Sequence, residues 1–377
     1  MIARKICWLL LVLSFLLMFF WLGSAAALAL ALSMLLIPII ALPLNLYISK
    51  RIACVIECGI NTRKGENSSA ELIVENPCLL PAFRMSCVIE AENCLTGEKQ
   101  NIELAAVLWP KGKKHLTFSV GDRFCGRIKL RLQCIKLYDL FSLVGVKRSV
   151  GMHRSITVLP DTFDQSLRMD MLSGSSDDSD SYSPHKPGWD VSEIFQIRDY
   201  VEGDSLRQIH WKLSGKMDRL VVRDPSLPVM RSLLLFWDRS NTALSNESMD
   251  AQAETVASLC RTLLDNSIVF TIGWNEPAEQ RCVLNAVNSM EDVVAMMPRM
   301  LSLQGTETGL TGAALLMEAL NGNRFSRIIY VSDSPDEAIE ALRGQSEISM
   351  LICGAGAPGA VCFDEENYRE QLSELIL

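Results

Sequence analysis

The chain has 377 residues, a formal net charge of -8 and 12 cysteines, and its mean hydropathy of +0.19 is high for a soluble enzyme. The acidic balance argues against a general nucleic-acid-binding protein, because neutralising phosphates requires a basic face. The cysteines are scattered without a CxxC pair and only four histidines are present, so neither a disulfide framework nor a structural zinc site is expected. Free thiols favour a reducing compartment.

Apolar residues are concentrated at the start of the chain, where no charged residue lies between Lys5 and Lys50. Residues 6–22 and 25–48 are each long enough to cross a bilayer, which predicts a transmembrane helical hairpin over residues 1–50. The cations that flank the hairpin are Arg4, Lys5, Lys50 and Arg51. By the positive-inside rule, both termini and the soluble domains are expected in the cytoplasm of a two-pass membrane protein. A signal peptide cleaved near residues 25–27 is the alternative interpretation.

Short segments of alternating polarity follow over residues 51–150. The expected strands are residues 70–74, 83–91, 101–107, 115–120 and 126–135. Turn-forming residues separate these segments, so this region is predicted to close into a β-sandwich domain.

Residues 151–230 form a third segment, in which serine and aspartate alternate over residues 173–188. This composition predicts a solvated polar loop or a disordered insert.

Strands alternate with helices over residues 231–377. The expected strands are residues 233–237, 268–274, 328–332 and 349–353, and the expected helices are residues 249–266, 290–303, 312–320 and 335–343. This order predicts an α/β domain with a parallel sheet covered on both faces. Ligands of such sheets bind beyond the carboxyl ends of the strands.

Two of these expected strands end in an aspartate. The oxygen-bearing residues expected at this edge are Asp238, Ser240, Thr242, Thr308 and Asp333. Hard oxygen ligands with few charges suit Mg²⁺, and two facing carboxylates would repel each other without a cation between them. The alternative is that both aspartates only cap the helices that follow them.

The same residues resemble the metal-ion-dependent adhesion site of a von Willebrand factor A domain. Asp238 and Ser240 match its DxSxS motif, with Thr242 at the last serine position. Thr308 begins a T-x-L-x-x-A pattern, and Asp333 matches the last aspartate. The resemblance implies a Rossmann-like parallel sheet and a divalent cation such as Mg²⁺ as cofactor. Arg239 beside the site would compete with that cation.

A second resemblance covers roughly residues 125–340. Residues 193–212, EIFQIRDYVEGDSLRQIHWK, are similar to the signature of the bacterial family called domain of unknown function fifty-eight. His210 and the pair Gly215-Lys216 depart from that signature. The resemblance implies a MoxR-type AAA+ ATPase as partner.

The signature is either a structural polar cluster or a surface that binds a partner. Its candidate residues are Arg198, Tyr200, Gly203, Asp204, Arg207, Trp211 and Lys212. Gly203 permits a tight turn, and Asp204 is expected to cap a short helix over residues 205–209 that places Arg207 and Trp211 on one face.

These expectations describe a membrane-anchored, non-enzymatic interaction or adaptor protein that works with a MoxR-type ATPase and a client protein. No catalytic residue is proposed, because no nucleophile has a base in a recognisable spacing. The alternative is a metal-dependent hydrolase that acts at the A-like site. A surface adhesin would require the opposite topology.

Overall fold

The structure is a computed structural model, and the residues it describes fall into several ranges. They are 2–168, 182–201, 204–228, 233–240, 245–302, 310–321, 325–334, 336, 338–344, 346–354 and 359–376. The chain divides into two compact units. Unit 1 contains residues 1–163, 241–258 and 291–306, and unit 2 contains residues 164–240, 259–290 and 307–377. The expected boundaries at residues 50, 150 and 230 stay predictions.

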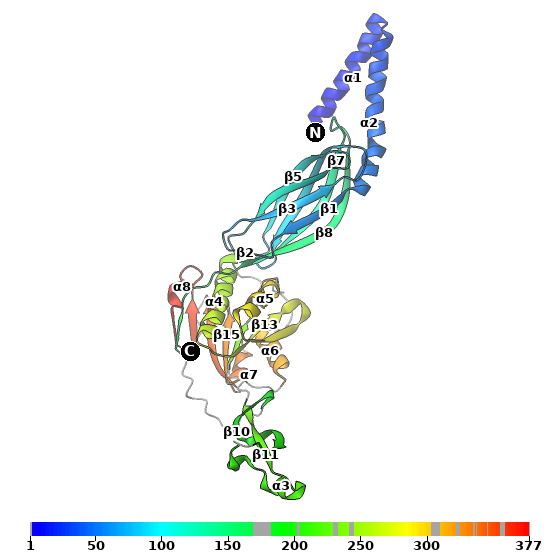
Figure 1. Cartoon of the computed structure of the whole chain (residues 1–377). Helices are drawn as coiled ribbons and strands as arrows, with labels where there is room; N and C mark the ends of the chain where they lie inside the picture. The colour runs from blue at the N-terminus through cyan, green and yellow to red at the C-terminus, as the bar shows by residue number, and fades with distance from the viewer. Residues whose placement is uncertain are drawn as a thin grey trace. The chain divides into compact units, whose positions relative to one another are not determined.

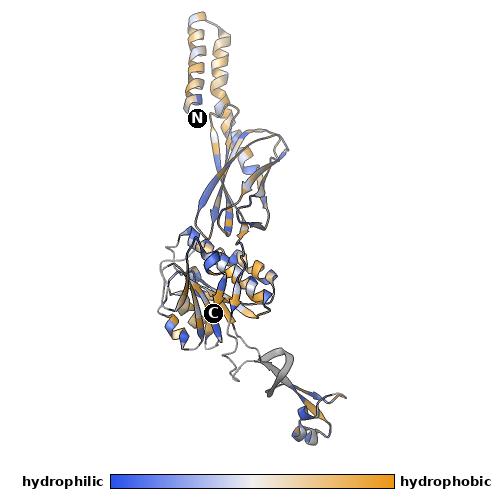
Figure 2. Ribbon diagram, turned by 90° about the vertical axis from the view of Figure 1, so that its left-hand side faces the viewer, coloured by the Kyte–Doolittle hydropathy of each residue, from blue (hydrophilic) through white to orange (hydrophobic). Residues whose placement is uncertain are grey.

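Unit 1 begins with two apolar helices, α1 (Ile2–Leu22) and α2 (Ala25–Arg51), which contact each other along their lengths. Gly23 ends α1 at a φ of 60°, in the left-handed region that glycine adopts without strain. Both helices are long and apolar enough to cross a membrane, and the ribbon in Figure 2 shows that most of their residues are hydrophobic. They are compatible with the expected hairpin.

Two sheets follow in unit 1 and share one core. The first contains β1 (Ala53–Cys58), β3 (Ser68–Glu75) and β6 (Lys113–Val120). The second contains, in spatial order, β2 (Asn61–Arg63), β8 (Gly145–Leu159), β7 (Gly126–Tyr138), β4 (Ala82–Asn93) and β5 (Lys99–Leu108). All pairings are antiparallel except that of β2 with β8.

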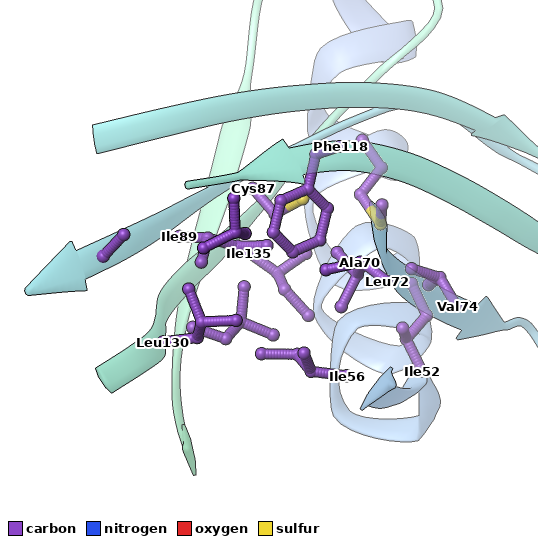
Figure 3. Packing of buried hydrophobic residues seen from close by; sticks show 14 of the residues in the cluster. Ile52, Ile56, Ala70, Leu72, Val74, Cys87, Ile89, Phe118, Leu130 and Ile135 are labelled. Carbon is purple, nitrogen blue, oxygen red and sulfur yellow. The ribbon is translucent and has the colours of Figure 1, made fainter. Parts of the chain in front are cut away.

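The core of this two-sheet body is aliphatic. Leu72 of β3 and Phe118 of β6 lie opposite Ile89 of β4 and Leu130 of β7, as Figure 3 shows. Alternate residues of each strand face this core, so one face of each sheet is buried while the other stays polar. Ile48, at the end of α2, belongs to the same buried cluster, which fixes the last turn of that helix to the sheets.

Unit 2 contains a six-stranded sheet in the order β14-β13-β12-β15-β16-β17. The strands are β12 (Leu233–Trp237), β13 (Phe270–Glu276), β14 (Arg281–Val287), β15 (Arg327–Ser332), β16 (Glu347–Cys353) and β17 (Ala360–Phe363). All neighbours are parallel except β13 and β14. Every residue of β12 and β15 is buried, as expected for central strands covered on both faces.

Helices and short elements complete the α/β region. They are α4 (Asn246–Asp265), which runs from unit 1 into unit 2, α5 (Met290–Met300), α6 (Gly312–Leu320), α7 (Ile339–Arg343), α8 (Tyr368–Gln371) and the 3-10 turn η2 (Pro277–Glu279). Leu316 of α6 and Leu342 of α7 pack in a buried cluster with side chains of β12, β15 and β16. A small parallel pair joins β9 (Ser166–Arg168) and β18 (Glu374–Ile376).

A separate two-stranded sheet of unit 2 carries the signature segment. It pairs β10 (Tyr182–Asp199) with β11 (Val221–Pro228), and between them lie η1 (Leu206–Gln208) and α3 (Trp211–Met217). We call residues 196–224 the signature module. Of the expected polar loop, residues 173–181 lie outside the described part of the chain, whereas residues 182–188 belong to β10, whose pairing with β11 shifts register several times.

Candidate functional site

Asp238 directly follows β12, at the carboxyl edge of the six-stranded sheet. The strands that follow β12 in sequence, β13 and β14, lie on one side of it, and the later strands β15, β16 and β17 lie on the other. The strand order therefore reverses at β12. Ligands of open parallel sheets bind at this position. The fold therefore places Asp238 where a functional residue is most expected.

The carboxylate of Asp238 is held by hydrogen bonds from three elements. Oδ1 accepts from Ser240 N at 2.9 Å, from Ser240 Oγ at 2.6 Å and from Asn275 Nδ2 at 3.0 Å. Oδ2 accepts from the hydroxyl of Tyr330 at 2.5 Å. Asn275 at the end of β13 also donates to Ser240 Oγ at 2.7 Å, so the four side chains form one network.

The first turn of α6 covers this network. Gly312 lies so close to Asp238 that a Cβ on it would come within 2.1 Å of Oδ1. Thr311 caps the helix by accepting a hydrogen bond from Ala314 N, which holds the glycine in place. Only a glycine permits this approach, and the amino end of a helix favours a nearby negative charge.

Burial dominates the electrostatics of Asp238, whose residue is only 7% exposed. Desolvation raises the pKa of its carboxyl group, and the charge of Asp336 adds to that rise. The hydrogen bonds from Ser240 and Tyr330 act in the opposite direction without cancelling the effect of burial. Burial, and after it the charge of the same carboxylate, raises the pKa of Tyr330 well above its usual value.

The five expected metal ligands are not all described. Thr242 and Thr308 lie outside the described residues, and Asp333 is half-buried just after β15. The acidic neighbour that shifts the pKa of Asp238 is Asp336. Where residues are described, no group of three or more histidine, cysteine or acidic side chains could hold a metal, although the expected site contains only two carboxylates.

The donor set around Asp238 fits a metal poorly. Oδ1 already accepts three hydrogen bonds, Tyr330 donates to Oδ2, and Gly312 lies against both oxygens. A cation with an octahedral oxygen shell needs open oxygen lone pairs and room for water. The described geometry therefore corresponds to a carboxylate satisfied by protein donors.

Arg239 follows Asp238 in the sequence and contacts Trp237 and Asn275. Its guanidinium lies over the Trp237 ring at 4.9 Å from the ring centre, and its backbone N–H donates to Asn275 Oδ1 at 2.7 Å.

The signature module brings Arg198, Asp204 and Asp224 together. The guanidinium of Arg198 donates to both carboxylate oxygens of Asp204, at 2.7 and 2.8 Å, and to Asp224 Oδ2 at 3.0 Å. Asp204 also accepts from Val201 N at 2.8 Å. The arginine and this backbone bond lower the pKa of Asp204 to about 2. This cluster ties the turn after β10 to β11.

The local expectation for the signature was right only in part. The carboxylate of Asp204 binds Arg198 and Val201 N. A short 3-10 helix, η1, lies within residues 205–209, but it ends at Gln208, and Ile209 forms a bridge to Val222. Arg207 and Trp211 therefore lie on different elements. A second helix, α3, begins at Trp211 and is capped by His210, whose ring accepts from Leu213 N.

Some of the remaining signature residues are held by hydrogen bonds, and others are exposed. Tyr200 N donates to Leu220 O, and Ser214 Oγ accepts from Val221 N, which fixes α3 to β11. Trp211 is 65% exposed, and Arg207 and Lys212 are exposed as well. Gly203 lies outside the residues described.

Asn275, Tyr330 and Gly312 were missed by the sequence analysis. Asn275 sits at the carboxyl end of a strand, which is a signal that the search for carboxylates and hydroxyls overlooked. Tyr330 pairs in register with Phe236 of β12, and its approach to Asp238 follows only from that pairing.

Comparisons with known proteins add little. No family model matches the chain, and no curated protein matches it. Among solved structures it is similar to the CARDB domain of a Pyrococcus furiosus protein in complex with di-metal ions, at 14% identity and a TM-score of 0.21 over 28% of this chain and 84% of that one. It is also similar to a β-glucosidase from Listeria innocua, at 8% identity and a TM-score of 0.21 over 28% of this chain and 16% of that one.

Proposed function

We propose that this chain is a membrane-anchored, non-enzymatic interaction protein that binds a MoxR-type AAA+ ATPase and, with it, a client protein. The observation that carries this proposal is the exposure of Trp211, Arg207 and Lys212 on a module that Arg198 holds together. Tryptophan and arginine are the side chains most enriched among residues that dominate binding energy at interfaces. Most signature residues thus either form hydrogen bonds that hold the module together or lie on its exposed surface.

We further propose that unit 2 holds a von Willebrand factor A-like domain of the family called domain of unknown function fifty-eight. The sheet order, with an antiparallel edge strand and Asp238 at the reversal point, supports this assignment. The described donors around Asp238 favour a metal-free site, so partner binding is assigned to the signature module.

Membrane anchoring with both termini in the cytoplasm belongs to the same proposal. It is supported by α1 and α2, by their flanking cations and by twelve cysteines that are all free, as a reducing compartment requires. A reporter that is active only outside the cytoplasm, fused after Leu377, should be inactive. Activity of that reporter would contradict the topology.

The binding test uses the full chain in lipid nanodiscs and the purified MoxR-type ATPase of the same genome. Trp211→Ala should reduce binding at least tenfold, in the range of an interface residue that contributes more than about 1.4 kcal/mol. Val269→Ala is the matched control, because Val269 is 66% exposed elsewhere in unit 2. Equal binding by both variants, or no binding by the native chain, would contradict the proposal.

A hydrolase acting at Asp238 is the competing function. The hydrogen bonds from Ser240, Asn275 and Tyr330 and the close approach of Gly312 weigh against it, because among the described residues they leave Asp238 only 7% exposed to a substrate. Turnover of an ester, phosphate or peptide panel by the native chain, abolished by Asp238→Asn, would favour the hydrolase.

A further inference from the structure

One end of the two-sheet body in unit 1 is built from three neighbouring turns. They are residues 76–84, 107–114 and 138–148, which we call the rim. Strand register joins them, since Ala82 pairs with Leu108, Arg84 with Tyr138 and Tyr138 with Gly145. The side chain of Asn76 donates to the backbone oxygens of Leu80 and Trp109, which fixes the first turn to the second.

The rim lies beside the apolar helices. The ring of Phe141 is 4.5 Å from the ring of Trp8 in α1, between their centres. Arg148 donates to the backbone oxygens of Ser49 and Ile52 at the end of α2, at 3.0 Å for Ile52. The rim is thus placed where the hairpin enters the two-sheet body (Figure 1).

Large apolar side chains of the rim are exposed. Leu79 is 75% exposed, Trp109 69% and Leu140 61%, and Phe83 and Phe141 are exposed as well. Such side chains on separate turns at one end of a domain are an exposed patch that calls for a partner surface.

The exposed charge of the rim itself is positive, and the exposed Glu75, which precedes it, lies opposite Lys113 in the strand register. The rim's exposed charged residues are Arg84, Lys111, Lys113, Lys114 and Lys147. Its one acidic residue, Asp139, is buried and accepts a hydrogen bond from Val144 N. The turns at the opposite end of the sheets carry both signs, with Glu66, Glu98, Asp122 and Asp161 accompanied by Lys64 and Arg123.

We infer that the rim is a lipid-contacting collar that rests in the headgroup layer of the bilayer that holds the hairpin. Aromatic side chains are enriched at this depth, and lysines beside them are attracted to the anionic lipids of the cytoplasmic leaflet. Continuity with α1 and α2 favours lipid over a protein partner as the occupant. This inference rests on the membrane anchoring proposed above.

The test is photo-crosslinking from single positions of the full chain in nanodiscs of phosphatidylcholine and phosphatidylglycerol. Benzoylphenylalanine replaces Leu79 in the rim, Ile60 as control and Leu13 in α1. Ile60 is 79% exposed and lies at the opposite end, where its carbonyl accepts from Thr157 N near the end of β8. The readout is the mass of the adduct, as lipid or as protein.

Lipid adducts from positions 13 and 79 but not from position 60 are the expected result. Their yield at position 79 should fall severalfold when Lys111 and Lys113 are both replaced by glutamine, with no change at position 13. Lipid adducts from position 13 alone would overturn the collar and leave the anchoring intact. Adducts of position 79 with protein instead of lipid would overturn the collar, because the rim would then face a copy of the chain or the scaffold protein. No lipid adduct at either position would contradict the anchoring itself.

Discussion

Asp238 and Asp204 are both held by hydrogen bonds within unit 2, yet the pKa values of their carboxyl groups are shifted in opposite directions. Asp238 is buried and its donors are neutral, from Ser240, Asn275 and Tyr330, so burial raises its pKa. Asp204 faces the guanidinium of Arg198, which lowers its pKa to about 2. Neutral donors form hydrogen bonds to a buried carboxylate but do not offset the free energy lost when its charge leaves water. A cation does stabilise that charge.

The largest expected effect comes from Asp238→Ala. This change leaves Asn275 Nδ2, the Tyr330 hydroxyl and Ser240 N without their shared acceptor in a buried region. Unpaired buried donors cost free energy, so the free energy of unfolding should fall by about 3 kcal/mol. Chemical denaturation of the detergent-solubilised chain measures this change. An unchanged or increased stability would mean that Asp238 is an unpaired charge in the folded chain.

Asp238→Asn is the matched control for that experiment. It keeps an oxygen acceptor for Asn275 and Ser240, and the Tyr330 hydroxyl can accept from the new amide. Its loss of stability should therefore be clearly smaller than that of Asp238→Ala. Equal losses would assign the effect to the charge of Asp238 rather than to its hydrogen bonds.

Tyr330→Phe should have the second-largest effect. It removes one hydrogen bond to a carboxylate at 2.5 Å and keeps the ring stacked on Phe236, so the free energy of unfolding should fall by about 2 kcal/mol.

The native chain should melt at the same temperature in Mg²⁺ and in chelator, because the hydroxyl of Tyr330 and three other donors already bind the carboxylate of Asp238. A magnesium-dependent melting temperature of the native chain would show that the carboxylate binds a cation.

The pH dependence of stability should differ in sign at the two aspartates. The raised pKa of Asp238 means that the folded chain binds this proton more tightly, so its contribution falls as pH rises from about 4 through the raised value. The contribution of Asp204 is complete above its unperturbed pKa of 3.8 and is lost as pH falls through about 2. Against pH, the melting-temperature difference between native chain and Asp238→Asn should shrink as pH rises from about 4, whereas the difference for Asp204→Asn should grow as pH rises from about 2 to 4.

The smallest effect is expected from Arg198→Lys. Lysine keeps the charge but loses the fork that binds both oxygens of Asp204 and reaches Asp224. Amide hydrogen exchange of Val221 and Val222 should become severalfold faster while the melting of the six-stranded sheet stays unchanged. Unchanged exchange at these two residues would mean that the Arg198 cluster does not brace the module.

Periodicity predicted much of the fold. It placed β12 at residues 233–237 and α6 at residues 312–320, and the structure has the same bounds. It missed β14 and β17, because edge strands carry mixed burial and lack a continuous apolar run. It also missed β8, in which polar residues such as Lys147 and Arg154 interrupt the alternation.

The candidate site was predictable only in part. Asp238 could be found, because an aspartate after an apolar strand marks the carboxyl edge of a parallel sheet. Its real partners could not, since Asn275 and Tyr330 come from strands 37 and 92 residues away and approach it only through sheet order and register. A sequence motif therefore identifies candidate residues, but the order and register of the strands determine which of them are in contact.

The central claim is that a partner docks on the signature module rather than at Asp238. The most direct measurement is the dissociation constant of the MoxR-type ATPase for the full chain in nanodiscs, compared between Trp211→Ala and Asp238→Asn. Trp211→Ala should raise the dissociation constant at least tenfold, and Asp238→Asn should keep it within about twofold of the native value. Lost binding in Asp238→Asn, with native binding in Trp211→Ala, would contradict the account and return the docking site to the carboxyl edge of the sheet.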